Sequence, residues 1–78
     1  MAVLRLFAAA RESAGTGRDD VGGETVGAVL EEARRRYGAD FARVLDGCRI
    51  WRNGEPAATD DPVDDDDELA VLPPVSGG

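Results

Sequence analysis

The chain has 78 residues, 42% hydrophobic and 32% charged, and no stretch long enough to span a membrane, so we expect one small cytoplasmic domain. Nine basic residues against sixteen acidic ones give a net charge of −7, which repels nucleic acids and anionic lipids and predicts no partner of either kind. The sequence contains no Lys, no His and one Cys, Cys48, which excludes lysine- and histidine-based catalysis and an internal disulfide.

The N-terminal segment predicts a strand, a helical turn and a second strand. Residues Ala2–Ala8 are apolar apart from one Arg, which is typical of a strand near the middle of a sheet. Residues Ala9–Ala14 predict a short helical turn, ended by the glycines Gly15 and Gly17. Residues Asp19–Val21 then predict a short strand that forms a hairpin with the first one.

The clearest element is a helix over Thr25–Tyr37. Thr25 suits the N-cap position, because its hydroxyl can accept a hydrogen bond from an otherwise unpaired N–H. Gly38 would end this helix in the left-handed conformation, and a second short helix would run from an Asp40 cap to Gly47. The apolar residues of the main helix fall on one face, at i, i+3, i+4, i+7 and i+11: Val26, Val29, Leu30, Ala33 and Tyr37.

The C-terminal half changes to a strand pattern. Residues Cys48–Arg52 alternate, and Asn53-Gly54 is a strong signal for a type I′ hairpin turn into a strand over Glu55–Ala58. A polar loop, Thr59–Asp67, leads to the last strand, Glu68–Leu72, which the pair Pro73-Pro74 ends.

The order of elements predicts an α+β fold with a hairpin at each end and one main helix between them. A mixed sheet of four to five strands would pack on this helix, since the helix has one apolar face to bury. The first and last strands are the most apolar, so we place them side by side and parallel in the centre. This arrangement is the ubiquitin-like β-grasp, with a domain over residues 1–73 and a flexible tail over residues 74–78.

The tail is the most informative part of the sequence. Pro-Pro favours a stiff, extended exit from the sheet, and the four residues after it span about 13 Å when fully extended. Glycine has no Cβ, so Gly77 and Gly78 could pass through a channel too narrow for other residues. A terminal Gly-Gly is also typical of a frayed end without function, so the residues alone leave a reactive tail and an idle one both open.

Four segments carry a resemblance to a known family. The C-terminal stretch Leu69–Gly78, with its ending Pro-Pro-Val-Ser-Gly-Gly, is similar to the C-terminus of the molybdopterin synthase small subunit family. Phe7–Gly15, Arg52–Glu55 and Asp66–Leu69 resemble that family's segment after the first strand, its central hairpin and its entry to the last strand. The ending is also similar to that of the small archaeal ubiquitin-like modifiers, which share this fold.

The resemblance implies a sulfur carrier that is not itself an enzyme and holds no permanent cofactor. An E1-like adenylating enzyme would use ATP and Mg²⁺ to convert the Gly78 carboxylate to an acyl-adenylate, and a persulfide would turn it into a thiocarboxylate. Pro74, Val75, Ser76 and Gly77 would thread into the active site of the molybdopterin synthase large subunit, which receives the sulfur. In the modifier branch, Gly78 is instead joined to lysines of target proteins.

Other residues have weaker patterns. Trp51, Leu72 and Phe7 are candidates for a docking surface on the sheet face opposite the helix, although alternation does not decide on which face Phe7 and Leu72 lie. Cys48 is predicted to be a small core residue. Residues Asp64–Asp67 are predicted to form a solvated loop without a metal, because the spacing and central glycine of a calcium loop are absent.

The arginines Arg34–Arg36 and Arg49 have two interpretations. The simpler one is an ordinary solvent-exposed surface. The alternative is contact with an acidic patch on a partner.

Overall fold

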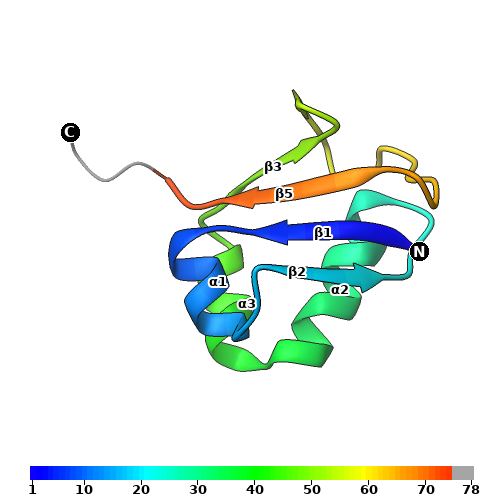
Figure 1. Cartoon of the computed structure of the whole chain (residues 1–78). Coiled ribbons are helices and arrows are strands. Elements are labelled where there is room, and N and C mark those ends of the chain that lie inside the picture. The colour runs from blue at the N-terminus through cyan, green and yellow to red at the C-terminus, as the bar shows by residue number, and fades with distance from the viewer. Residues whose placement is uncertain (75–78) are drawn as a thin grey trace.

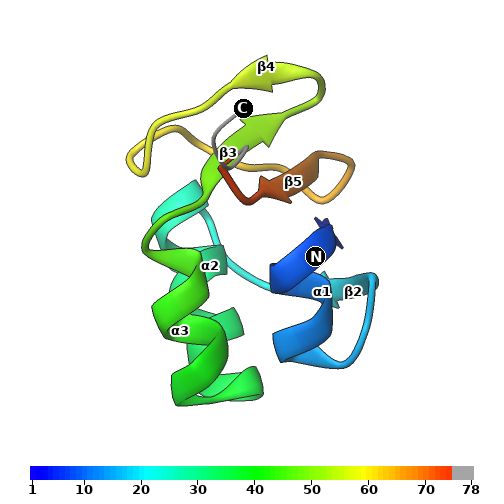
Figure 2. The same ribbon diagram turned by 90° about the vertical axis from the view of Figure 1, so that its left-hand side faces the viewer.

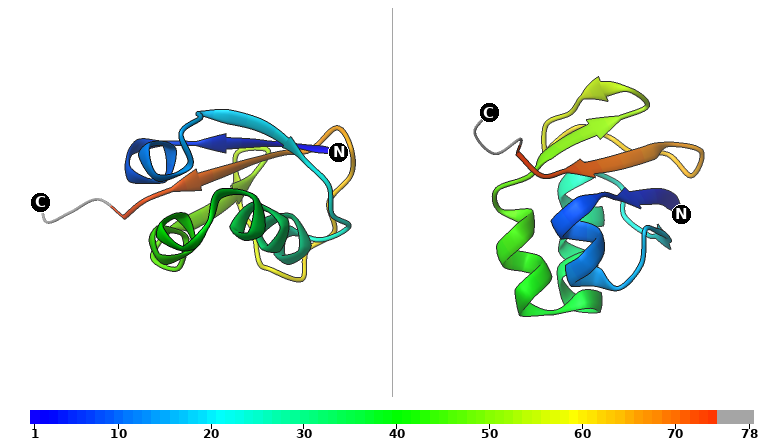
Figure 3. Two further views of the ribbon diagram at one scale, coloured as in Figure 1. Left: turned by 90° about the horizontal axis from the view of Figure 1, so that it is seen from below. Right: turned by 60° about the vertical axis from the view of Figure 1, so that its left-hand side comes forward.

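Five strands and three helices form within residues 1–74, the part of the chain that this computed structural model describes (Figure 1). In chain order they are β1 (Ala2–Leu6), α1 (Ala8–Ala14), β2 (Arg18–Val21), α2 (Val26–Tyr37), α3 (Ala39–Leu45), β3 (Arg49–Arg52), β4 (Glu55–Pro56) and β5 (Glu68–Leu72). The helices lie together on one side of the sheet (Figures 2 and 3). The opposite face of the sheet is covered by no element of residues 1–74.

The sheet has the strand order β2-β1-β5-β3-β4. At its centre β1 and β5 pair in parallel, with Leu4 opposite Leu69, and the other neighbouring strands pair antiparallel. This confirms the predicted β-grasp with the first and last strands side by side. Because β1 and β5 run in the same direction, the N-terminus and the end of β5 lie at opposite ends of the sheet (Figure 1).

Alternation along the two central strands decides which side chains enter the core. In β1 every second residue is buried against the helices, namely Ala2, Leu4 and Leu6, and in β5 the same holds for Leu69 and Val71. The remaining residues of both strands therefore point to the open face of the sheet. The face of α2 that packs on this core consists of the predicted residues Val26, Val29, Leu30 and Ala33.

Hydrogen bonds hold the N-terminal end of α2. As predicted, Thr25 is the N-cap, and its Oγ1 accepts a hydrogen bond of 3.1 Å from the Ala28 N–H. The loop after β4 supplies two further acceptors at this end: the Asp61 carbonyl, 3.0 Å from the Val26 N–H, and the Thr59 carbonyl, 2.7 Å from the Gly27 N–H. These bonds pair donors that helix geometry leaves unpaired.

The junction between α2 and α3 corrects two predictions. Gly38 has φ 97° and ψ −172°, so it has a positive φ but not the left-handed helical conformation. It serves at once as the C-cap of α2 and the N-cap of α3, so no separate capping residue is needed. The second helix therefore begins at Ala39, and Asp40 lies inside its first turn instead of capping it.

Several further boundaries differ from the sequence pattern by one or two residues, and two of them have a clear cause. The first strand ends at Leu6 instead of Ala8, because the Phe7 carbonyl already accepts the first helical bonds, from the N–H groups of Ala10 and Arg11. The fourth strand has two residues instead of reaching Ala58, since Pro56 has no N–H for a ladder and the Ala58 N–H donates to Asp61.

The turn between β3 and β4 agrees with the prediction. Asn53 and Gly54 have φ values of 51° and 85°, both positive, as a type I′ turn requires.

Candidate functional site: the tail exit and the open face of the sheet

The chain leaves the folded domain at the end of the central strand β5. Leu72 is its last residue and lies opposite Arg49 of β3, and Pro73 and Pro74 follow, half-buried and exposed respectively. The predicted reactive residue Gly78 and the predicted threading residues Val75, Ser76 and Gly77 lie outside the described residues, so of the predicted tail only Pro74 is placed.

The strand register brings the three predicted docking residues to one face. Trp51 lies opposite Ala70, a β5 residue that points away from the helices, and Leu72 follows two residues later on the same face. Phe7 comes after the buried Leu6 in extended backbone, with φ −127° and ψ 151°, and therefore points to the open face as well. The structure thus places Phe7 and Leu72 on the open face, which alternation in the sequence did not decide.

The exposures of these residues suit a surface that a partner could cover. Phe7 is 39% exposed, one of the two large hydrophobic side chains that are exposed within residues 1–74. Trp51 and Leu72 are half-buried. The Arg5 guanidinium carbon lies 5.8 Å from the centre of the Phe7 ring, within the range of a cation–π contact.

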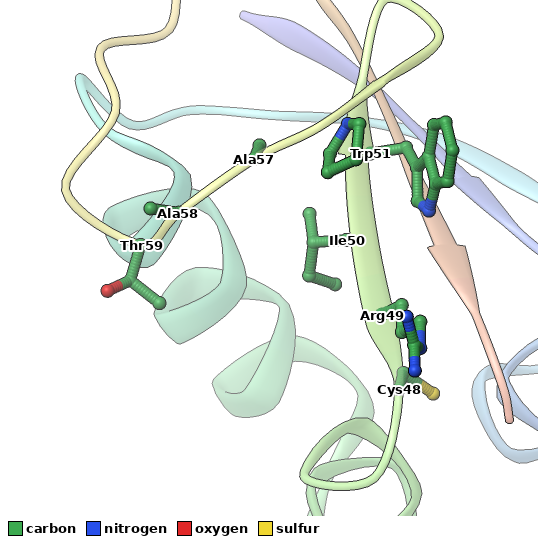
Figure 4. A pocket seen from close by; sticks show the side chains of 8 residues that line it. Cys48, Arg49, Ile50, Trp51, Ala57, Ala58 and Thr59 are labelled. Atoms are coloured by element: carbon green, nitrogen blue, oxygen red, sulfur yellow. The ribbon is translucent and has the colours of Figure 1, made fainter.

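Two hollows of about 400 Å³ each flank β3 and share Arg49 and Trp51. The first lies between β3 and the segment after β4, with Cys48, Ile50 and Thr59 in its wall (Figure 4). The second is a groove lined by Arg49, Trp51, Leu72, Pro73 and Pro74, directly beside the tail exit. In Figure 4, Arg49 and Trp51 project from one side of β3 and Ile50 from the other, which places the arginine and the tryptophan on the open face.

Cys48 is half-buried against the core, close to its predicted role. Its Sγ–H donates to the Val44 carbonyl at 3.2 Å, and burial raises the pKa of the thiol. A raised pKa lowers the thiolate fraction at neutral pH, so this cysteine is a poor nucleophile.

The acidic loop before β5 is stabilised by its own hydrogen bonds. Asp67 accepts from the Asp64 N–H and from the Asn53 side-chain amide, both at 2.8 Å, and these bonds lower the pKa of the Asp67 carboxyl. Within residues 1–74, no three His, Cys, Asp or Glu side chains come together as a metal ion would need.

Arg34, Arg35 and Arg36 are paired with carboxylates of the chain itself. Arg34 contacts Asp46 at 3.2 Å, and Arg35 contacts Glu32. Arg36 contacts Asp19 at 2.9 Å. These exposed pairs fit the simpler interpretation of an ordinary solvated surface.

Sequence reasoning missed one side-chain cluster, which joins α2 to β2. The Tyr37 hydroxyl and the Arg36 guanidinium both donate to the Asp19 carboxylate, and Arg36 also donates to the Asp20 carbonyl at 2.9 Å. The two hydrogen bonds lower the pKa of Asp19, while burial and the bond to Asp19 raise the pKa of Tyr37 to about 12. Asp19 lies 17 positions before Arg36 and 18 before Tyr37, so no helical or strand period in the sequence links these residues.

Comparison with known proteins supports the fold and extends it to a family. The small archaeal modifier protein 1 of Haloferax volcanii is 40% identical over 95% of this chain and 97% of its own length. The solution structure of the small archaeal modifier protein 1 from Methanosarcina acetivorans, 30% identical, superposes with a TM-score of 0.87 over 99% of this chain and 95% of that one.

A third similar structure is a putative molybdopterin converting factor, subunit 1, from Pyrococcus furiosus, which is 26% identical. It superposes with a TM-score of 0.83 over 95% of this chain and 97% of its own. The ThiS family model matches residues 4–78 and so includes the predicted tail. The chain therefore belongs to the ThiS family, whose members are small ubiquitin-like sulfur carriers and modifiers.

Proposed function

We propose that this protein is the sulfur-carrying small subunit of a molybdopterin synthase, with Gly78 as its working residue. The observation that carries the proposal is the exit of the chain from the centre of the sheet. The central strand β5 ends at Leu72, beside the open face of the sheet, and the family match continues from there to Gly78. The folded domain then serves to present a carboxylate to active sites on partner proteins.

The chemistry follows from the poor reactivity of a carboxylate. An E1-like adenylating enzyme uses ATP and Mg²⁺ to join AMP to the Gly78 carboxylate and releases pyrophosphate. The outer sulfur of an enzyme persulfide attacks the acyl carbon and AMP leaves. A second thiol then cleaves the resulting acyl disulfide, which forms an enzyme disulfide and frees the Gly78 thiocarboxylate. This chain contributes no catalytic group.

The residues before Gly78 fit such a reaction by their size. Pro74 sets an extended exit, and Val75, Ser76 and Gly77 become progressively smaller toward the end. A narrow channel in the activating enzyme or in the synthase large subunit could therefore admit the last residues and exclude bulkier chains. Trp51, Leu72 and Phe7 would dock on the partner and hold the tail at the channel mouth.

The experiment that tests the molybdopterin role uses the thiocarboxylated protein with a synthase large subunit and the pterin precursor. The relative that is called a molybdopterin converting factor subunit supports this acceptor. With the thiocarboxylated protein we expect sulfur to appear in the pterin as a dithiolene. With the carboxylate form of the protein we expect no sulfur in the pterin. A thiocarboxylate that forms normally but transfers no sulfur to the pterin would contradict the molybdopterin role.

A second function, covalent protein modification, is supported by the 40% identical relative, which is called a modifier protein. The same activated Gly78 would be captured by a lysine amine of another protein to give an isopeptide. Affinity purification of the tagged protein, followed by peptide sequencing, should then find Gly78 joined to lysines of several proteins. Recovery of noncovalent partners alone would contradict this function.

A further inference from the structure

We propose that the adenylating enzyme docks on the open face through an apolar surface that carries a carboxylate opposite Arg49. This inference rests on the proposed function and adds the chemistry of the partner. It starts from the composition of the groove beside the tail exit, in which one exposed guanidinium lies among the apolar side chains of Trp51, Leu72, Pro73 and Pro74.

Arg49 has no anionic partner in the described part of the chain. No carboxylate of residues 1–74 lies within 4.0 Å of its guanidinium, whereas Arg5 on the same face contacts Glu68 at 3.7 Å. On the helical side, Arg34 and Arg36 are each paired with carboxylates. Arg11, Arg18 and Arg52 also have no ion pair within residues 1–74, but of these four arginines only Arg49 lines the tail-exit groove.

Covering Trp51 and Leu72 would remove water from Arg49 as well, because it projects beside Trp51 and lies opposite Leu72 (Figure 4). Burying a guanidinium without a partner costs far more than the apolar contact contributes. A surface that docks here must then supply an acceptor, and a carboxylate is the acceptor that matches a guanidinium in charge and geometry.

The length of the tail brings the enzyme close to this groove. The four residues after Pro74 span at most about 13 Å, so the reacting site of the enzyme must lie within that distance of the tail exit. Charge also orients the encounter. The exposed acidic residues Asp64–Asp66 precede β5 and lie at its opposite end, so an acidic docking surface is repelled there and attracted at Arg49.

The test measures adenylation of the chain by the activating enzyme of the same cell, as pyrophosphate exchange at low salt. We expect Arg49→Glu to lower kcat/KM at least about tenfold, mainly through KM, and the loss to shrink as salt is added. Arg49→Lys, which keeps the charge, should retain most of the activity. The control is Arg43→Glu, the same charge change at an exposed position of helix α3. It also loses the exposed ion pair with Asp40, a small effect on stability, and adenylation should stay within about twofold of the wild type.

Thermal melting of each variant separates docking from folding. If Arg49→Glu melts like Arg43→Glu and is adenylated equally well, the inference is wrong. If the wild-type chain is not adenylated by a competent enzyme, the proposed function fails and the inference with it, and this result is distinct from a defect confined to Arg49→Glu.

Discussion

Replacing Gly23 by Ala tests the packing of the main helix against the turn that precedes it. Gly23 has φ 155°, which L residues rarely adopt, and it lies on the surface. A Cβ added there would stand 2.6 Å from the Val29 backbone nitrogen and 2.8 Å from the Val29 side chain. The obstacle is the backbone of α2 itself, so a rotamer change cannot relieve it.

The expected loss follows from two terms. The unfavourable φ costs about 1–3 kcal/mol, and the backbone shift that the clash forces costs a further 1–3 kcal/mol or so. We therefore expect the free energy of unfolding to fall by about 2–6 kcal/mol, a large share of the roughly 4–12 kcal/mol typical of a domain of this size. The melting temperature should fall by about 10–45 °C.

The neighbouring residue provides the matched control. An added Cβ at Gly22 meets no atom within 4 Å, and Gly22 has no positive φ, so Gly22→Ala should be neutral or stabilise by about 0.4–1 kcal/mol. Guanidinium unfolding at pH 7, followed by circular dichroism, measures both variants. A difference between them below about 1 kcal/mol would refute the reasoning, because the same chemical change would then have no dependence on position.

Further predictions concern the Asp19 cluster and the docking face. Tyr37→Phe should lower the free energy of unfolding at pH 7 by about 1 kcal/mol, since the bond to Asp19 is lost. Burial and that bond raise the pKa of Tyr37 from 10.0 to about 12, so wild-type stability should decline as the pH rises from 10 to 12, a decline absent in Tyr37→Phe unfolding titrations. The same bond and Arg36 lower the pKa of Asp19 below 3.8, so this stabilisation is complete above that pH and is lost as the carboxyl is protonated. Trp51→Ala should reduce kcat/KM for adenylation by about 30-fold or more, with a small change in the free energy of unfolding. Phe41→Ala, at a fully buried position, should instead lower the free energy of unfolding by about 3–5 kcal/mol. Equal stability losses at the two positions would contradict these assignments.

The elements that sequence patterns predicted best are those governed by local rules. The helix over Val26–Tyr37 combines a capping Thr25 with an apolar face of the right period, and both features act within one turn of helix. The turn at Asn53-Gly54 was equally clear, because few residue pairs tolerate two positive φ angles. The parallel pairing of β1 and β5 followed from their apolar character and from the helix between them.

What the patterns did not predict depends on residues far apart in the chain. The positions of Phe7 and Leu72 on one face became clear only from the register of β1, β5 and β3, because β1 and β5 carry apolar residues on both faces. Val63 lies in a polar loop but is 7% exposed, since the loop folds back on the start of α2. The groove at the tail exit combines two segments, β3 and residues 72–74, so the lack of a carboxylate of residues 1–74 beside Arg49 gave no signal in the sequence.

The most direct test of the central claim is the mass of the intact chain after incubation with its activating enzyme, ATP, Mg²⁺ and a persulfide donor. We predict a gain equal to the exchange of one oxygen for sulfur, located on Gly78 by fragmentation and absent from a variant that ends at Ser76. An unchanged mass with an enzyme that is competent on another carrier, or sulfur found on any other residue, would contradict the account.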